Sequence, residues 1–309
     1  MAKSHVVAID LGGTKIAAAL VNRNGGISRR MVADVDTASP SATVNQIVGL
    51  TRDLVGKNKI NGHIKGIGIA VPGLIRRDGT VWAPNLPGWR KMPLARRLRK
   101  VLRVPIVVES DRNAVVLGET WRGAAKGKSD AIVLMLGTGI GAGILSGGRL
   151  IRGAHELSGC AGWMVIADTF GYEAQSVGQL ESLAAGPAIA RLAVKEMPAP
   201  LEKAASKPLT AYQLAKAARC GDPVAIRVYS EAGRVLGYAV ANLVSLFDPE
   251  VVVIGGGLAQ ASDLFLDVLR KSMKERAQPI SAKCVRVVTS NLGSDANLLG
   301  VARLALMRA

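Results

Sequence analysis

Cysteine is scarce in this chain, and its three copies lie far apart. Cys160, Cys220 and Cys284 are odd in number and form no C-x-x-C pair. This spacing argues against a disulfide framework and against a zinc site built from neighbouring cysteines. Reduced thiols in a cytoplasm are the expected state.

Histidines and long apolar runs are also rare. The only histidines are His5, His63 and His155, and their separation gives no sequence-local metal site. The apolar run 131–145 is short and rich in glycine, which favours a buried hairpin over a membrane span. The N-terminal residues lack the pattern of a signal peptide. We therefore expect a cytoplasmic protein without a membrane partner.

Acidic residues are few beside the basic ones: 23 Asp and Glu face 40 Lys and Arg, a formal charge of +17. Much of the excess lies in 90–103, where leucines recur at helical spacing and cations fill the other positions. Such charge raises the question of a nucleic-acid partner. No aromatic residues are interleaved there to stack on bases, so a solvated helix face is favoured.

Apolar segments alternate with glycine-rich turns along the chain. Strands are expected at 5–10, 15–21, 26–35, 64–75, 105–110, 130–136, 141–148 and 250–257. Helices are expected at 41–55, about 94–102, from 111, within 174–194 and 209–247, and at 294–307. This alternation predicts an α/β fold.

Two segments of the chain echo each other. AIDLGGTKIAAAL and VLMLGTGIGAGIL each consist of an apolar strand, a Gly/Thr turn and a second strand of small residues. Glycine turns can bring backbone N–H groups close to a phosphate. Asp10 ends the first strand beside its turn, where a carboxylate can hold Mg²⁺ through water. The echo predicts two lobes of related topology.

Two further glycine patterns are misleading. GAAKGKS, residues 123–129, is one residue short of a P-loop and precedes a strand, so we set it aside. GTGIGA, residues 137–142, matches the dinucleotide-binding pattern, but a strand is expected after it instead of a helix. A dinucleotide enzyme stays a minor alternative.

Eight motifs occur in order along the chain. They are AIDLGGTKIAAALV, GIGIAVPGLI, APNLPGW, ESDRNAVVLGE, LGTGIGAGIL, GAHELSG, DPEVVVIGGGL and LGSDANLLGVARLA. In this order and spacing they resemble the ROK family of sugar kinases, glucokinase-like members of the actin-like ATPase superfamily. The resemblance covers nearly the whole chain.

The resemblance implies a two-lobed, ribonuclease H-like α/β fold of mixed sheets flanked by helices, with the active site in the interlobe cleft. The expected lobes are 1–118 plus 297–309, and 119–296. The implied reaction moves the γ-phosphoryl group of ATP to a primary hydroxyl of a hexose, with Mg²⁺ as cofactor and glucose as the default acceptor. A homodimer is also implied.

By the same resemblance, Asp111 is the catalytic base and Asn85 contacts the sugar. From the residues alone, Asp111 also fits a helix N-cap, and Asn85 also fits a turn. The implied phosphate loops are Asp10, Gly12, Gly13, Thr14 and Lys15, then Gly137, Thr138 and Gly139, with Gly255, Gly256 and Gly257 beside the adenosine. Phosphoryl transfer needs mainly positioning and charge neutralisation, which these residue types supply.

The chain departs from the family pattern in one region. Cys160 and Trp163 replace a glutamate and a histidine that bind sugar in the family, and that histidine also binds a structural zinc. The three zinc-binding cysteines of the family correspond here to Tyr172, Ala174 and Gln179. All four zinc ligands are lost, so no structural zinc is expected.

The departures leave alternatives open for single residues. Trp163 either fills the volume of the lost zinc site or stacks on the apolar face of a sugar. Cys160 is expected to be a small buried residue. Glu181 survives at the last motif position and can contact the sugar, and Ser110 stands where an asparagine precedes the aspartate in the family.

The alternatives to a glucose kinase are a kinase for another acceptor, a polyphosphate-dependent kinase, a non-catalytic sugar- or nucleotide-binding protein, and a ROK repressor. A repressor carries a helix-turn-helix ahead of the shared core. Because the first expected strand begins by about His5, we do not expect one here.

Overall fold

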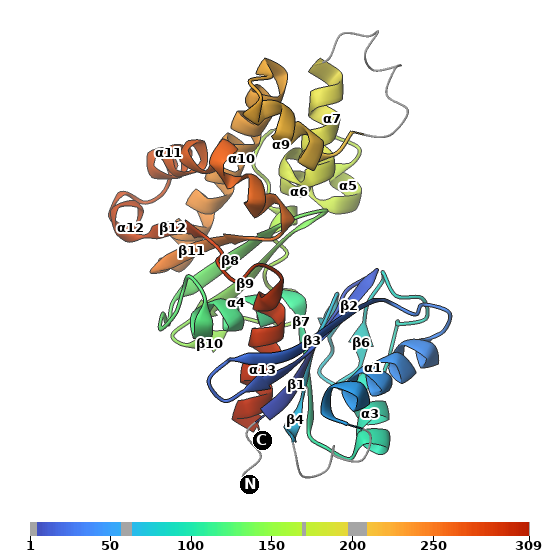
Figure 1. Ribbon diagram of the computed structural model, residues 1–309. Helices are drawn as coiled ribbons and strands as arrows, with labels where there is room; N and C mark the ends of the chain where they lie inside the picture. The colour runs from blue at the N-terminus through green and yellow to red at the C-terminus, as the bar shows by residue number, and fades with distance from the viewer. Residues whose placement is uncertain (1–4, 57–63, 169–170, 197–208, 309) are drawn as a thin grey trace. The chain divides into compact units, whose positions relative to one another are not determined.

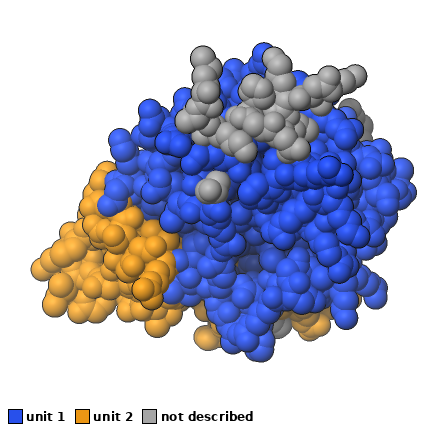
Figure 2. Space-filling model, turned by 90° about the horizontal axis from the view of Figure 1, so that it is seen from below, with its two compact units in different colours: residues 1–127, 150–158, 292–309 blue, residues 128–149, 159–291 orange. Residues whose placement is uncertain are grey.

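The computed structural model describes residues 5–56, 64–168, 171–196 and 209–308. The chain divides into two compact units (Figure 2). Unit 1 contains 1–127, 150–158 and 292–309, and unit 2 contains 128–149 and 159–291. The expected boundaries at 118 and 297 differ from these because they cut helices α4 (Asp111–Arg122) and α13 (Ala296–Arg308), each of which stays whole in unit 1.

Unit 1 is built on a five-stranded sheet with the order β3-β2-β1-β4-β7 (Figure 1). The first three strands are antiparallel, and β4 and β7 continue the sheet in parallel. The strands are β1 (His5–Leu11), β2 (Lys15–Asn22), β3 (Ile27–Asp34), β4 (Ile64–Val71) and β7 (Ile106–Ser110). The antiparallel start expected from the two glycine turns is confirmed.

Both faces of this sheet are covered, because successive residues of a strand point to opposite sides. Val7, Ile9 and Leu11 pack toward α1 (Pro40–Val55) and α3 (Leu94–Leu102). Val6 and Ala8 pack toward α13, which lies beside α4 on the other face (Figure 1). A small hairpin, β5 (Leu74–Ile75) and β6 (Val81–Trp82), and the short helix η3 (Gly293–Asp295) complete the unit.

Helices α4 and α13 pack unusually closely through glycine. A Cβ on Gly300 would lie 1.7 Å from the carbonyl oxygen of Ala114, and one on Gly118 would lie 2.1 Å from that of Ala296. No larger residue fits either position without moving a helix. This contact fixes α4, whose first residue is Asp111, against the sheet.

Unit 2 repeats the plan of unit 1. Its sheet has the order β10-β9-β8-β11-β12, with β8 and β9 antiparallel and β11 and β12 parallel to β8. The strands are β8 (Ala131–Leu136), β9 (Ile140–Ser146), β10 (Arg149–Leu150), β11 (Val251–Gly255) and β12 (Arg286–Thr289). The two related topologies predicted from the internal echo are confirmed.

The helices of unit 2 gather around α10, the longest of the described chain (Figure 1). They are η1 (Ala161–Trp163), α5 (Ala174–Val177), α6 (Gln179–Ala184), α7 (Gly186–Glu196), α9 (Ala211–Arg219), α10 (Pro223–Phe247), η2 (Gly257–Leu264), α11 (Leu266–Arg276) and α12 (Pro279–Cys284). No helix in the described ranges has the length and apolarity needed to cross a membrane.

Candidate functional site

The first glycine turn joins β1 to β2 in unit 1. Gly12 N donates to Lys15 O at 2.8 Å and closes the turn. A Cβ on Gly12 would lie 2.9 Å from that same oxygen, so glycine is required there. Among the described residues, no hydrogen bond uses the N–H groups of Gly13 and Thr14, and both Thr14 and Lys15 are exposed. The turn therefore offers donors to an anion.

Asp10 lies beside this turn in a buried setting. Its pKa is raised to about 6, mainly by burial. The hydrogen bond from Asn297 lowers the pKa, and the nearby charge of Asp111 raises it. Asn297 Nδ2 donates to Asp10 Oδ1 at 3.2 Å, and Asn297 Oδ1 is buried without a partner among the described residues. A carboxylate and an orphaned amide oxygen are hard donors that suit Mg²⁺ held through water.

Asp111 is the first residue of α4, and Ser110 is the N-cap. Ser110 Oγ accepts from Asn113 N at 3.3 Å, so the alternative that Asp111 caps the helix is wrong. The Asp111 carboxylate accepts from Arg112 N at 2.8 Å. Burial raises the pKa of Asp111, and that hydrogen bond opposes the shift. A carboxylate with a raised pKa suits a general base.

Glu109, just before this cap, is a buried charge that sequence reasoning missed. It is 7% exposed and accepts from Ser110 N and from Asn113 Nδ2, at 3.0 and 2.9 Å. Its other oxygen pairs with Arg152 Nη2 at 2.5 Å. Arg152 belongs to 150–158, the segment by which the chain returns to unit 1. The ion pair therefore ties that segment to the helix end that carries Asp111.

Asn85 lies in the loop between β6 and α3, and it is exposed. A Cβ on Gly13 would lie 3.5 Å from the Cβ of Asn85, so the loop touches the first glycine turn. Unit 1 thus brings together predicted residues from three separate motifs. Asp10 and Asp111 interact through their charges, and Asn85 lies against the turn beside them.

The second glycine turn joins β8 to β9 in unit 2. Gly137 N donates to Gly139 O at 3.0 Å, and Gly137 O accepts from Gly186 N at the start of α7. Gly137 and Thr138 line a cavity of about 720 Å³ together with Gly257, the last glycine of the third predicted run. Gly255 and Gly256 do not line it. Gly256 instead has a positive φ of 85° and lies against Leu136 O.

The other walls of this cavity come from residues that sequence reasoning missed. They include Pro187, Thr210, Tyr212, Arg219 and Tyr229. Arg219 is held by both oxygens of Asp263, at 2.9 and 2.7 Å, and Tyr229 OH donates to Ala211 O at 2.6 Å. These residues lie on helices without a local motif, so only the fold brings them to the glycines.

Glu181 links the second turn to residues 159–163, the stretch that contains Cys160 and Trp163. Its carboxylate accepts from Ile140 N at 2.7 Å. A Cβ on Gly139 would lie 2.8 Å from Glu181 Oε2, and one on Gly162 would lie 2.9 Å from it. Burial raises the pKa of Glu181, and the hydrogen bond from Ile140 opposes the shift. Both glycines therefore make room for this carboxylate.

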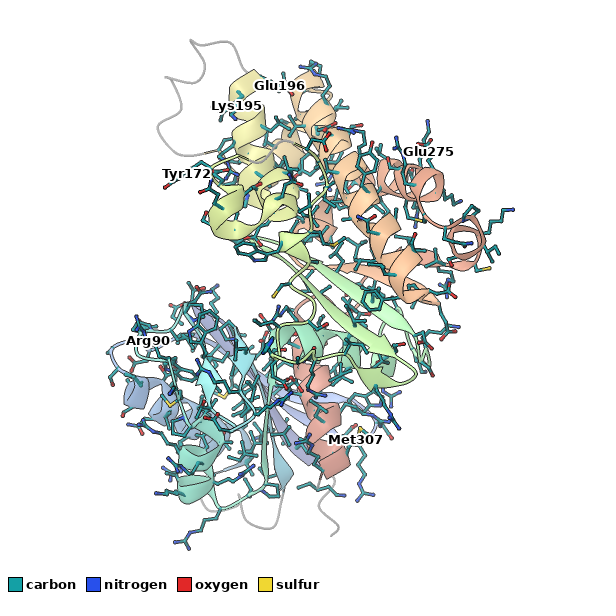
Figure 3. The ribbon with its side chains drawn as sticks, turned by 180° about the vertical axis from the view of Figure 1, so that it is seen from behind. Arg90, Tyr172, Lys195, Glu196, Glu275 and Met307 are labelled. Carbon is teal, nitrogen blue, oxygen red and sulfur yellow. The ribbon has the colours of Figure 1, made fainter. Side chains whose placement is uncertain are left out.

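Trp163 is not buried. Its side chain is 56% exposed at the end of η1, so of the two alternatives apolar burial is wrong and a stacking surface stays a prediction. Cys160 is only partly buried. Tyr172, at a former cysteine position, is 86% exposed (Figure 3), whereas Ala174 is buried.

Gln179 occupies the interior at another of these positions and is 2% exposed. Its Oε1 accepts from Ile166 N and Ala167 N, and its Nε2 donates to Ala167 O at 2.7 Å. One amide thus holds the segment after η1 by three hydrogen bonds. No cluster of three or more metal-ligating side chains is found in the part of the chain that the structure describes.

Comparison with known proteins agrees with this geometry. The model of the ROK family matches residues 6–308. The chain belongs to the ROK family. A glucokinase of Streptomyces coelicolor is 34% identical over 316 residues, covering 97% of this chain and 96% of that one. The ROK family has repressors too: the xylose repressor of Caldicellulosiruptor bescii is 31% identical, and the match covers 96% of this chain and 76% of the repressor.

The same agreement holds for solved structures. A ROK family glucokinase from Streptomyces griseus, in complex with glucose and AMPPNP, has a TM-score of 0.80 and 32% identity, covering 98% of this chain and 99% of that one. The predicted fold class is confirmed: this ROK protein has the α/β actin-like ATPase fold, with mixed sheets flanked by helices.

Proposed function

We propose that this ROK protein is a sugar kinase that transfers the γ-phosphoryl group of ATP to a primary hydroxyl of a hexose, with glucose as the first acceptor to test. The carrying observation is the unit 2 cavity, where two separate glycine runs meet beside aromatic and cationic side chains. The similarity to a glucokinase structure with glucose and an ATP analogue supports the same conclusion.

In this proposal the nucleotide binds to unit 2. Its adenosine lies in the cavity that Tyr212 and Gly257 line, and its phosphates take N–H groups at Thr138 and Gly139. The first turn, with Gly13 and Thr14, supplies further donors from unit 1. Backbone donors fixed before binding favour the developing charge of the transferred phosphoryl group, because they need no reorganisation.

Asp111 is the proposed base in unit 1, and Asp10 with Asn297 is the proposed Mg²⁺ site. Bound Mg²⁺ supplies neutralisation of the phosphate charge. Asp111 accepts the proton of the attacking hydroxyl, a role worth about 10²- to 10⁴-fold in rate. Its raised pKa follows from burial and keeps it a better proton acceptor than a solvated aspartate.

The acceptor is proposed to contact Asn85, Ser110, Glu181 and the exposed ring of Trp163. Ser110 Oγ and one oxygen of Glu181 already serve the protein itself, as a helix cap and as the acceptor for Ile140 N. Hydroxyl recognition here therefore differs from a site in which these groups are free, and sugar discrimination is sensitive to such partners. Trp163 offers its face to the apolar side of a sugar ring.

The proposal is tested by measuring ADP release from Mg²⁺-ATP across glucose, mannose, fructose and N-acetylhexosamines, with Asp111→Asn as the inactive control. ADP release that depends on one of the sugars supports it. If no sugar stimulates release, a non-catalytic binding protein is favoured. If the sugar is phosphorylated only when polyphosphate replaces ATP, and no ADP is released with ATP, then ATP is not the donor. We also propose that the protein is a cytoplasmic homodimer. Light scattering of the purified protein would test the dimer.

A further inference from the structure

A second cavity lies within unit 1, in the loop that carries Asn85. Its volume is about 700 Å³, close to that of the unit 2 cavity. Aromatic and aliphatic side chains, among them Trp82, Leu86 and Trp89, form much of its lining, and three cations join them: Arg76, Arg90 and Lys91. Asn85 does not line it, and neither does Asp111. The cavity is therefore separate from the acceptor residues described above.

The loop around this cavity is shaped by its own hydrogen bonds. Val81 and Met92 exchange two backbone hydrogen bonds, at 2.8 and 3.0 Å, and Ala83 N donates to Trp89 O at 2.9 Å. Trp89 is 1% exposed and anchors the loop from inside, whereas Trp82 keeps part of its surface open. Because these hydrogen bonds form within the loop itself, the cavity exists before any ligand binds, which reduces the cost of ordering.

The charges at the cavity all have one sign. Arg76 Nη1 donates to Arg90 O at 2.5 Å, which fixes the guanidinium and leaves other N–H groups free to donate. Arg90 is exposed and labelled on unit 1 in Figure 3, and neither it nor Lys91 has an ion pair within the described residues. No lining residue is acidic. Asp78, outside the lining, accepts from Thr80 N and Oγ. It also interacts through its charge with Arg76 and Lys91, so three cations face one exposed carboxylate.

An anion is therefore the ligand that this site can neutralise. Arg guanidinium groups bind phosphate through paired hydrogen bonds, and a lysine adds a point charge. An isolated inorganic anion would leave the apolar part of the cavity unused. Trp82 and the prolines beside it provide a surface for the C–H face of a ring.

We propose that this cavity binds a phosphorylated monosaccharide, with its phosphate on Arg76, Arg90 and Lys91 and its ring against Trp82. The choice of a sugar among ring-bearing phosphates rests on the proposed function, since a hexose kinase releases such a molecule. Because the same loop presents Asn85 to the first glycine turn, an occupied cavity biases the position of Asn85. The site would then be regulatory, with product as its ligand.

The test is a calorimetric titration of the full chain with glucose 6-phosphate, without ATP, so that it does not depend on turnover. The Arg90→Ala/Lys91→Ala variant should bind about tenfold or more weakly, as expected for the loss of charged contacts to phosphate. The matched control is Arg97→Ala/Lys100→Ala, which removes two exposed cations of α3 outside the cavity. Thermal unfolding of both variants checks that they fold.

Three results would overturn the proposal. Unchanged binding by the Arg90→Ala/Lys91→Ala variant would place the ligand in the acceptor site instead. Equal weakening in the control would show a general effect of net charge. If inorganic phosphate bound as tightly as glucose 6-phosphate, or AMP more tightly, a phosphorylated sugar would not be the ligand of this cavity. Each of these results can occur whether or not the ADP-release assay succeeds. Failure of this second site can therefore be told apart from failure of the proposed kinase activity.

Discussion

Asp111 combines burial with backbone hydrogen bonds that only partly oppose it, and this combination sets its expected pH dependence. Its pKa is raised by burial, and a base acts only when it is deprotonated. Activity should be present above the raised pKa and lost as the pH falls through it. We predict an acidic limb in kcat/KM above the range of a free aspartate, about pH 4. Asp111→Asn should lower kcat by about 10²- to 10⁴-fold.

The rate would be measured from about pH 4 to 9, with saturating substrates for kcat and with limiting substrate for kcat/KM. The fall of kcat/KM at low pH is the predicted acidic limb. Asp78→Asn is a matched control, because Asp78 is an exposed aspartate of unit 1 whose pKa is lowered by its hydrogen bonds with Thr80. If Asp111→Asn kept its rate, Asp111 would not be the base.

Gln179 is expected to stabilise the fold through its hydrogen bonds to residues 166–167, in the region where the family binds zinc. Gln179→Leu keeps the volume but leaves Ile166 N and Ala167 N without their acceptor. Ile166 is half-buried and Ala167 is exposed, so water can partly replace the lost acceptor, and we predict a drop of about 1–3 kcal/mol in the free energy of unfolding. Denaturant titration measures it.

The control for this substitution is Gln175→Leu, at an exposed position of α5, which should change stability little. Incubation with a chelator should leave the unfolding transition of the unmodified protein in place. A large loss of stability on chelation would show that a metal, and not Gln179, holds this region.

At the scale of elements, the start of α4 is positioned by the ion pair of Glu109 and Arg152. Arg152→Gln leaves a 7% exposed carboxylate without its cation, which typically costs about 3–5 kcal/mol. If the pair positions Asp111, kcat should fall about tenfold or more while the KM for ATP changes little, since a 1 Å misplacement can cost more than that. Arg152→Lys should recover part of the rate.

Steady-state kinetics of these variants separate kcat from KM. The control is Arg191→Gln, which breaks the ion pair with Glu173 in unit 2, where both side chains are about half exposed. It should leave kcat unchanged. Equal kcat in Arg152→Gln and the wild type would limit the pair to a structural role.

The elements around the two glycine turns were predictable because each turn follows an apolar strand and precedes another. The periodicity of α1 and α3 likewise gave their buried faces, since apolar residues recur every three or four positions. Short strands such as β12 were missed, because four residues of half-buried pattern carry little signal.

Single residues of the site were harder to assign. Glu109, Arg152 and Tyr212 function through partners far away in sequence, which no local pattern reveals. The sequence left two alternatives open for Trp163, and only its exposed side chain in the structure rules out apolar burial.

At the scale of the whole molecule, two units with the same sheet plan carry different chemistry. Unit 1 contributes the carboxylates Asp10 and Asp111, and unit 2 contributes the cavity of about 720 Å³ beside the second glycine turn. The repeated strand–turn–strand motif predicted that the two units share a sheet topology. It did not reveal that 150–158 returns to unit 1, because that assignment depends on contacts and not on a repeated motif.

The most direct measurement of the central claim is ³¹P NMR of the purified protein mixed with Mg²⁺-ATP and a hexose. The account predicts that a sugar 6-phosphate resonance grows as the γ-phosphate signal of ATP declines, and that Asp111→Asn shows neither change on the same timescale. Release of inorganic phosphate without a phosphorylated sugar, or the same product from Asp111→Asn, would contradict it.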